Sequence, residues 1–117
     1  MIRRASERQK AENTMFGGPG LSHFTRILNE GEFCGKGRLF SHVLLHPGEG
    51  IGNHSHNNEF EVYCFIKGNG TYDDNGKNVE VSAGDVTICP SGENHGIFNS
   101  GNEDLEFIAL ILFCGDK

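Results

Sequence analysis

The chain has 117 residues, enough for one domain with a single hydrophobic core and too few for two. Sixteen acidic residues against ten basic ones give a net charge of −6, which argues against nucleic acid or an anionic membrane as a partner. No apolar run approaches the ~20 residues of a membrane-spanning helix. The N-terminal sequence MIRRASERQK also lacks the apolar core of a signal peptide. We therefore expect a cytoplasmic protein with no membrane partner.

Residues 1–37 are expected to form an N-terminal arm and a first strand. A short helix is predicted over residues 5–12, ending before the glycine-rich segment MFGGPGL. The first strand is predicted over residues 23–28, and the following NEGEFCGKG is expected to be a loop. The arm has no obvious hydrophobic core of its own.

From residue 38 onward, strand signals recur at short, even spacing and turn residues separate them. Asn75-Gly76 is a strong hairpin signal, because both central positions of a type I′ turn need positive φ. Many short antiparallel strands with regular turns predict a sandwich or a barrel. The predicted strands cover residues 38–46, 59–67, 70–73, 77–82, 85–89, 96–100 and 105–114.

Three histidines and one glutamate stand out within this strand-rich region. In a strand, residues i and i+2 share a face, so His54 and His56 point the same way and offer two imidazoles to one ion. Glu61 and His95 lie on neighbouring predicted strands and can complete the set. Mixed nitrogen and oxygen donors suit a divalent transition metal, and such a set leaves positions for water or substrate.

The spacing of these residues resembles the two signature motifs of the cupin superfamily. The first stretch reads G-x5-H-x-H-x4-E-x6-G from Gly48 to Gly68, and the second reads G-x5-P-x-G-x2-H-x3-N from Gly84 to Asn99. Every motif position is filled, and 15 residues separate the two stretches. The resemblance implies an all-β fold, a small antiparallel jelly-roll β-barrel over residues 38–117. It also implies that His54, His56, Glu61 and His95 bind one divalent transition metal ion per chain, which is Mn, Fe, Co, Ni or Zn.

The resemblance gives a range of reactions and no single one. Cupins carry out dioxygenation, decarboxylation and isomerisation, so one expectation is a metalloenzyme acting on a small sugar, organic acid or aromatic substrate. The alternative is a non-catalytic module that binds or senses a small molecule through the metal. Small cupins often pair through the sheet face away from the metal, so we also expect a homodimer, with residues 1–28 docking onto the second subunit.

An enzyme needs a group that transfers protons near the ion, and three residues are candidates. Tyr63 shares the strand face of Glu61, His42 lies in the middle of a predicted strand, and Glu59 is close in sequence. We expect substitution of Tyr63 or His42 to lower turnover without loss of metal. Core packing for Tyr63 and a structural role for His42 remain open. Two residues have no partner that the sequence identifies, His23 and His46.

Overall fold

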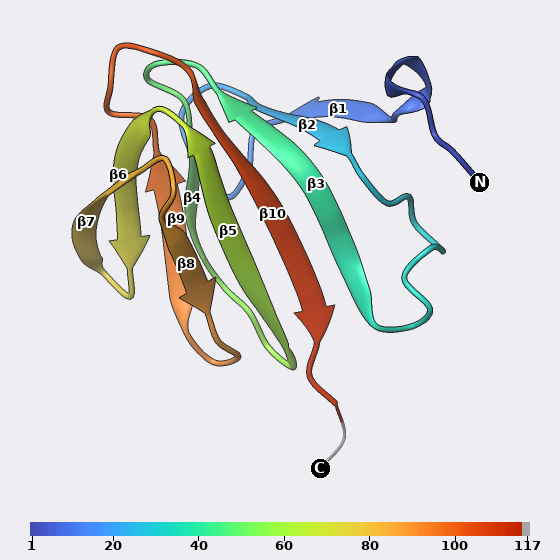
Figure 1. Ribbon diagram of the computed structural model, residues 1–117. Coiled ribbons are helices and arrows are strands. Elements are labelled where there is room, and N and C mark those ends of the chain that lie inside the picture. Colours follow the sequence, from blue (N-terminus) through green and yellow to red (C-terminus); the bar gives the residue numbers. More distant parts are fainter. Residues whose placement is uncertain (116–117) are drawn as a thin grey trace.

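The computed structural model describes residues 1–115, whose regular structure is almost entirely β-strand (Figure 1). The strands are β1 (Lys10–Asn13), β2 (Ser22–Arg26), β3 (Gly37–Leu45), β4 (Gly50–Ser55), β5 (Glu59–Lys67), β6 (Asn69–Asp74), β7 (Lys77–Ser82), β8 (Val86–Cys89), β9 (Asn94–Phe98) and β10 (Leu105–Phe113). They form a six-stranded sheet in the order β1-β2-β3-β10-β5-β8 and a four-stranded sheet in the order β4-β9-β6-β7. All pairings between these strands are antiparallel, which confirms the predicted jelly-roll class.

The hydrophobic core lies between the two sheets. Strand β10 supplies much of it, because its sequence is apolar at nearly every position and period-two alternation buries every second side chain in the core. At its centre, Phe107 pairs with Val43 of β3 and Phe65 of β5, and all three are essentially inaccessible to solvent. The smaller sheet contributes Ile51 and Ile97 from the opposite side. The two sheets are thus held face to face by one continuous apolar layer.

The strand and turn predictions from residue 38 onward are largely confirmed, each strand end lying within two residues of its predicted position. Asn75 and Gly76 have φ values of 54° and 93° and connect β6 to β7 through a two-residue turn, as their sequence predicts. The signature glycines lie at reversals and all have positive φ; they are Gly48, Gly68, Gly84 and Gly92.

The N-terminal arm differs from the prediction. The predicted helix over residues 5–12 is wrong: only Ala5–Glu7 form one 3₁₀ turn, and Lys10–Asn13 form β1. Strand β1 pairs with β2 and β2 pairs with β3, so the arm extends the six-stranded sheet. Sheet pairing fixes the backbone hydrogen bonds of this segment, which overrides a weak helical preference. Within residues 1–115, no helix is long and apolar enough to cross a membrane.

Strand β4 was missing from the predicted strands. Its sequence GIGNHS contains two glycines, which weaken a strand signal. The structure shows why they are needed, because a Cβ on Gly52 would lie 1.9 Å from the carbonyl oxygen of Phe16. The chain after β1 runs alongside β4 at this point, and Met15 forms a parallel bridge to Ile51. The close approach of the Phe16 backbone therefore requires glycine at position 52 of this strand.

Candidate metal centre

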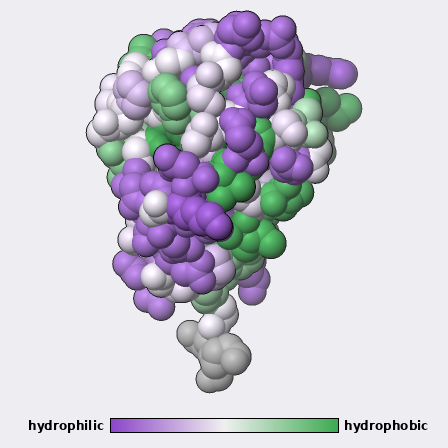
Figure 2. Space-filling model, turned by 90° about the vertical axis from the view of Figure 1, so that its left-hand side faces the viewer, coloured by the Kyte–Doolittle hydropathy of each residue, from purple (hydrophilic) through white to green (hydrophobic). Residues whose placement is uncertain are grey.

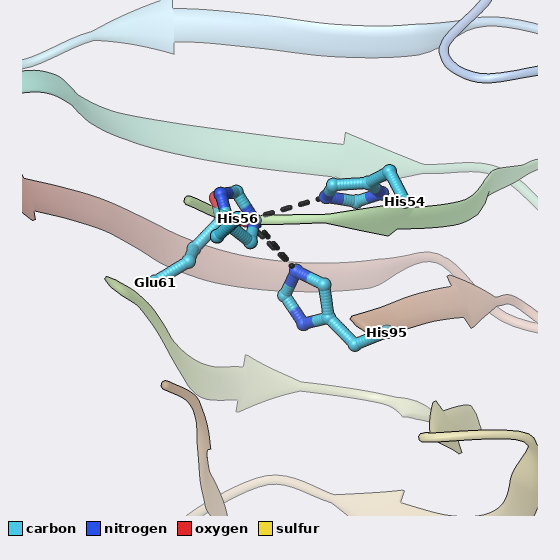
Figure 3. A group of neighbouring side chains, drawn as sticks. All are labelled: His54, His56, Glu61 and His95. Atoms are coloured by element: carbon cyan, nitrogen blue, oxygen red, sulfur yellow. Dashed lines mark hydrogen bonds and ion pairs between the residues drawn. The ribbon is translucent and has the colours of Figure 1, made fainter. Parts of the chain in front are cut away.

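The four predicted ligands come together where the two sheets meet (Figure 3). His54 on β4 lies directly opposite His95 on β9, because these two strands pair in that register. His56 follows β4 immediately, and Glu61 enters from β5 of the other sheet. Their relative exposures are 9% or less, so the polar groups face one another within the barrel.

The ligand atoms converge closely enough to share one ion. Nε2 of His56 lies 2.9 Å from Oε1 of Glu61 and 3.1 Å from Nε2 of His95. Nε2 of His95 lies 3.0 Å from the same carboxylate oxygen, and Nε2 of His54 lies 3.6 Å from it. All four donor atoms lie within 4.8 Å of one another. Three imidazole nitrogens and one carboxylate oxygen form a group able to bind a transition metal.

The outer nitrogens of the three imidazoles support this assignment. Each Nδ1 has a hydrogen-bond partner behind it, and each Nε2 points toward the shared centre. Such partners fix the ring orientation and the tautomer, so that Nε2 presents its lone pair to an ion. Nδ1 of His54 donates to the Gly52 carbonyl at 2.8 Å, Nδ1 of His56 donates to Glu59 at 2.6 Å, and Nδ1 of His95 bonds the Tyr72 hydroxyl at 2.7 Å.

The electrostatics of the centre favour an ionised glutamate. Burial opposes the charge of Glu61, but the nearby imidazoles, of which His56 and His95 hydrogen-bond its carboxylate, hold the pKa of this carboxyl far below the ordinary value. The hydrogen bond to Glu61 raises the pKa of His56, whereas burial lowers the pKa of His95. Glu61 thus offers an ionised carboxylate oxygen to an incoming cation.

Glu59 lies behind the ligand group and not within it. Its Oε1 and Oε2 each accept a 2.7 Å hydrogen bond from the Arg38 guanidinium, while Oε2 also accepts from His56. These two hydrogen bonds between Arg38 and Glu59 lower the pKa of Glu59 and raise the pKa of Arg38. Glu59, offered by the sequence as a proton-transfer group, is therefore placed to orient an imidazole.

Tyr72 on β6 is a functional neighbour that the sequence analysis missed. Its hydroxyl bonds Nδ1 of His95, and burial raises the pKa of that hydroxyl. A period-two pattern shows that Tyr72 is buried but not which histidine it meets, because that depends on β6 pairing with β9. The only sequence signal for a role of Tyr72 is that a tyrosine stands within a strand-rich region.

A cavity of about 190 Å³ is lined by three of the four candidate ligands, His54, His56 and Glu61. Tyr63 lines it and stacks on His95, with ring centroids 5.0 Å apart. Burial, with the nearby charge of Glu61 adding to it, raises the pKa of the Tyr63 hydroxyl, which therefore stays protonated. Phe16, from the chain after β1, also lines the cavity and stacks on His54, with ring centroids 4.1 Å apart.

His42 lies on the other face of its strand. On β3 the buried residues are Ser41, Val43 and Leu45, and His42 alternates with them toward the outside. Its Nε2 lies 2.9 Å from Oε1 of Glu106, and it is not among the residues that line the cavity. The structure brings Tyr63 to the candidate centre and does not bring His42 there.

Comparison with known proteins agrees with this geometry: the chain belongs to the cupin family. The model of the cupin domain matches residues 41–111, which include all four clustered ligands. The match excludes the N-terminal arm, although β1 and β2 belong to the same sheet as β3.

Individual relatives support the same assignment. An oxalate-binding protein from Thermotoga maritima is 42% identical over 113 residues, covering 96% of this chain and 93% of that protein. A crystal structure of a predicted oxalate decarboxylase from Thermotoga maritima has a TM-score of 0.90 at 42% identity, covering 97% of this chain and 99% of that one. A polyketide cyclase from Streptomyces resistomycificus shares the fold alone, with a TM-score of 0.77 at 15% identity, covering 98% of this chain and 81% of that one.

Proposed function

We propose that the protein binds one divalent transition metal ion per chain through His54, His56, Glu61 and His95, and holds a small carboxylate of the oxalate class beside it. The observation that carries the proposal is the convergence of four ligand atoms in a group of which His54, His56 and Glu61 line a small cavity. Mn, Fe, Co, Ni and Zn all accept this donor set. When bound, the ion would supply positive charge to an anionic ligand.

The cavity suits a small anion. Its volume of about 190 Å³ is below the usual range for drug-sized ligands. Two arginines, Arg26 and Arg38, lie among its lining residues. Arg38 is held by Glu59, whereas the Arg26 guanidinium forms no ion pair with any residue that the structure describes. Of the two arginines that line the cavity, Arg26 is therefore the one available to a ligand carboxylate.

The similar proteins favour the same ligand class. The relative from Thermotoga maritima is called an oxalate-binding protein, and it aligns with almost the whole of this chain. Oxalate is a small dianion, which matches the size of the cavity and the charge of Arg26. The apolar part of the lining, which includes Met15 and Ile111, limits the room for larger polar ligands.

Calorimetric titration of oxalate into the metal-loaded protein tests the proposal. We expect binding by the wild type and at least tenfold weaker binding by Arg26→Ala, because an anion loses its charged partner. Lys67→Ala is the matched control, since Lys67 pairs with Glu106 away from the cavity. Absence of oxalate binding by the loaded wild type would overturn the proposal.

A second candidate function, a metalloenzyme acting on such an acid, is favoured by Tyr63. This hydroxyl lines the cavity and stays protonated, so it can donate a hydrogen bond or a proton to a bound substrate. We expect Tyr63→Phe to lower turnover of oxalate while metal content is unchanged. Formate and carbon dioxide would be measured as products, and their absence from the wild type would leave the binding function alone.

We further propose that two copies of the chain associate through the outer face of the six-stranded sheet. Strands β5, β8 and β10 are apolar on this face as well as on the core side, and several of these side chains are exposed. Figure 2 shows hydrophobic residues between the centre and the right-hand side of a largely hydrophilic face. The outer-face apolar residues are Val62, Ile66, Val86, Ile88, Ile108, Leu110 and Leu112.

A second copy is the proposed occupant of this face, because neighbouring exposed apolar side chains such as Val86 and Ile88 mark interaction surfaces. Light scattering at micromolar concentration should give twice the mass of one chain. Ile88→Glu, a change at a residue 61% exposed, should shift the mass toward one chain. A wild-type monomer would contradict this part of the proposal.

A cytoplasmic location is supported by the free thiols, including the exposed Cys34 and Cys64, which persist in a reducing compartment.

A further inference from the structure

A second group of metal-ligating side chains lies on the outer face of the six-stranded sheet. It consists of His23 on β2, His46 directly after β3, and Glu49 in the turn before β4. One donor atom from each lies within 4.8 Å of the others. His23 and His46 are the two histidines that the sequence left without a partner.

The three side chains are arranged around one carboxylate oxygen. Oε1 of Glu49 lies 2.9 Å from Nε2 of His23 and 3.2 Å from Nδ1 of His46. The two imidazole rings are tilted against each other with centroids 4.6 Å apart. This is the same kind of convergence that Glu61 makes with its histidines.

His23 also has the orienting contact that is typical of metal ligands. Its Nδ1 lies 2.7 Å from Oε2 of Glu12, on the neighbouring strand β1. The pair matches His56 and Glu59 at the first centre, where a carboxylate holds Nδ1 and leaves Nε2 for the ion. Glu12 therefore serves as a positioning residue.

The turn that carries the other two ligands is fixed to the barrel. Asn99, which is 1% exposed, donates its backbone NH to the Glu49 carbonyl and accepts from the backbone of Gly48. The Glu49 backbone NH bonds the His46 carbonyl at 3.0 Å. The ligand carboxylate is held as well, since it accepts the backbone NH groups of His46 and Leu21. The group is thus preorganised.

The two groups cannot share one ion, because they face opposite sides of the same sheet. Phe24 on β2 lines the cavity, and His23 next to it points the other way by strand alternation. The His46 side chain is 48% exposed, whereas those of His23 and Glu49 are 16% and 18% exposed. An ion bound by these three side chains would remain in contact with solvent on one side.

We propose that His23, His46 and Glu49 form a second metal site, which binds a divalent ion of the zinc class. Two imidazoles and one glutamate are a known zinc ligand set, and they leave a fourth position for water. The site is independent of the proposed function at the first centre. The competing interpretation is a hydrogen-bonded ion-pair network that binds no metal.

Zinc stoichiometry separates these interpretations. Full-length protein is freed of metal with a chelator, dialysed to equilibrium against zinc chloride, and analysed for zinc per chain. We expect two equivalents for the wild type and one for His46→Ala. His42→Ala, which removes another histidine from the same outer face, should keep two. His23→Ala should also bind one equivalent of zinc. Because His23 lies on β2, its result shows that the loss in His46→Ala is not caused by a change in the exposed turn.

His54→Ala separates the two proposals, because it should lose only the zinc of the first centre. Loss of one equivalent in His46→Ala and His23→Ala establishes the second site, whatever His54→Ala shows. Circular dichroism of each variant confirms that the fold is retained. Equal zinc in wild type, His46→Ala and His23→Ala would overturn the second site.

Discussion

Glu59 accepts a 2.6 Å hydrogen bond from Nδ1 of His56, and the same carboxylate is clamped by two 2.7 Å hydrogen bonds from Arg38. A buried imidazole is thereby fixed with its other nitrogen toward the centre. The sequence places Glu59 two residues from Glu61, but the structure gives the two carboxylates different roles, one behind the histidine and one among the ligands.

Replacing Glu59 with glutamine should weaken metal binding by about 10- to 100-fold, the usual effect of losing an orienting carboxylate. The neutral amide orients the imidazole less strongly, and it no longer pairs with Arg38. Competition against a chromogenic chelator measures the change. Glu106→Gln is the matched control, because Glu106 also holds a histidine, His42, but away from the centre. Equal affinities in both variants and the wild type would contradict the assignment.

We expect Asn99 to contribute to the stability of the fold and not to metal binding at the first centre. Its amide donates to the carbonyl groups of Leu45 at 2.9 Å and Glu103 at 2.8 Å, and it is 1% exposed. Asn99→Ala leaves these two acceptors without their donor and should reduce the free energy of unfolding by about 1–3 kcal/mol. Urea denaturation of metal-free protein measures this. An unchanged midpoint would show that water replaces the amide without cost.

The N-terminal arm should be held partly by an acid-sensitive ion pair. Arg3 bonds Glu32, and this hydrogen bond, together with the Asn29 backbone NH, lowers the pKa of Glu32 from its ordinary 4.5. Because the folded-state pKa is depressed, the pair contributes stability above pH 4.5, and that contribution is lost as the pH falls through the lowered value.

Carbon-detected NMR titration of the Glu32 carboxyl measures this effect. In Arg3→Ala the pKa of Glu32 should rise toward 4.5, and the stability difference from wild type should shrink below that pH. Arg4→Ala is the control, since the Arg4 side chain forms no ion pair among residues 1–115. A Glu32 pKa that is the same in wild type and Arg3→Ala would disprove the contact in solution.

The sequence predicts part of the ligand group from local information, because His54 and His56 share a face through period two. The assignment of Glu61 and His95 comes from the resemblance to the two cupin motifs, and the structure brings them to the pair from β5 of the other sheet and from β9, which pairs with β4. The regular turns predict an antiparallel all-β sandwich or barrel from short-range spacing and backbone geometry, and the resemblance to the cupin motifs narrows this to a jelly roll.

Features that depend on strand neighbours could not be predicted in this way. Alternation correctly separates the two faces of β3, with His42 on one and Val43 on the other, but it does not say which face is inside. Tyr72 meets His95 only because β6 lies beside β9. Strand β4 was hidden by Gly52, whose need arises from the backbone of Phe16, 36 residues earlier in the chain.

The central claim is that His54, His56, Glu61 and His95 bind a metal ion, and metal content tests it most directly. Elemental analysis of purified wild type, His54→Ala, His95→Ala and the control His42→Ala gives the moles of each transition metal per chain. We expect both ligand variants to contain one equivalent less than the wild type, and His42→Ala to match it. Equal metal in all four proteins would contradict the claim.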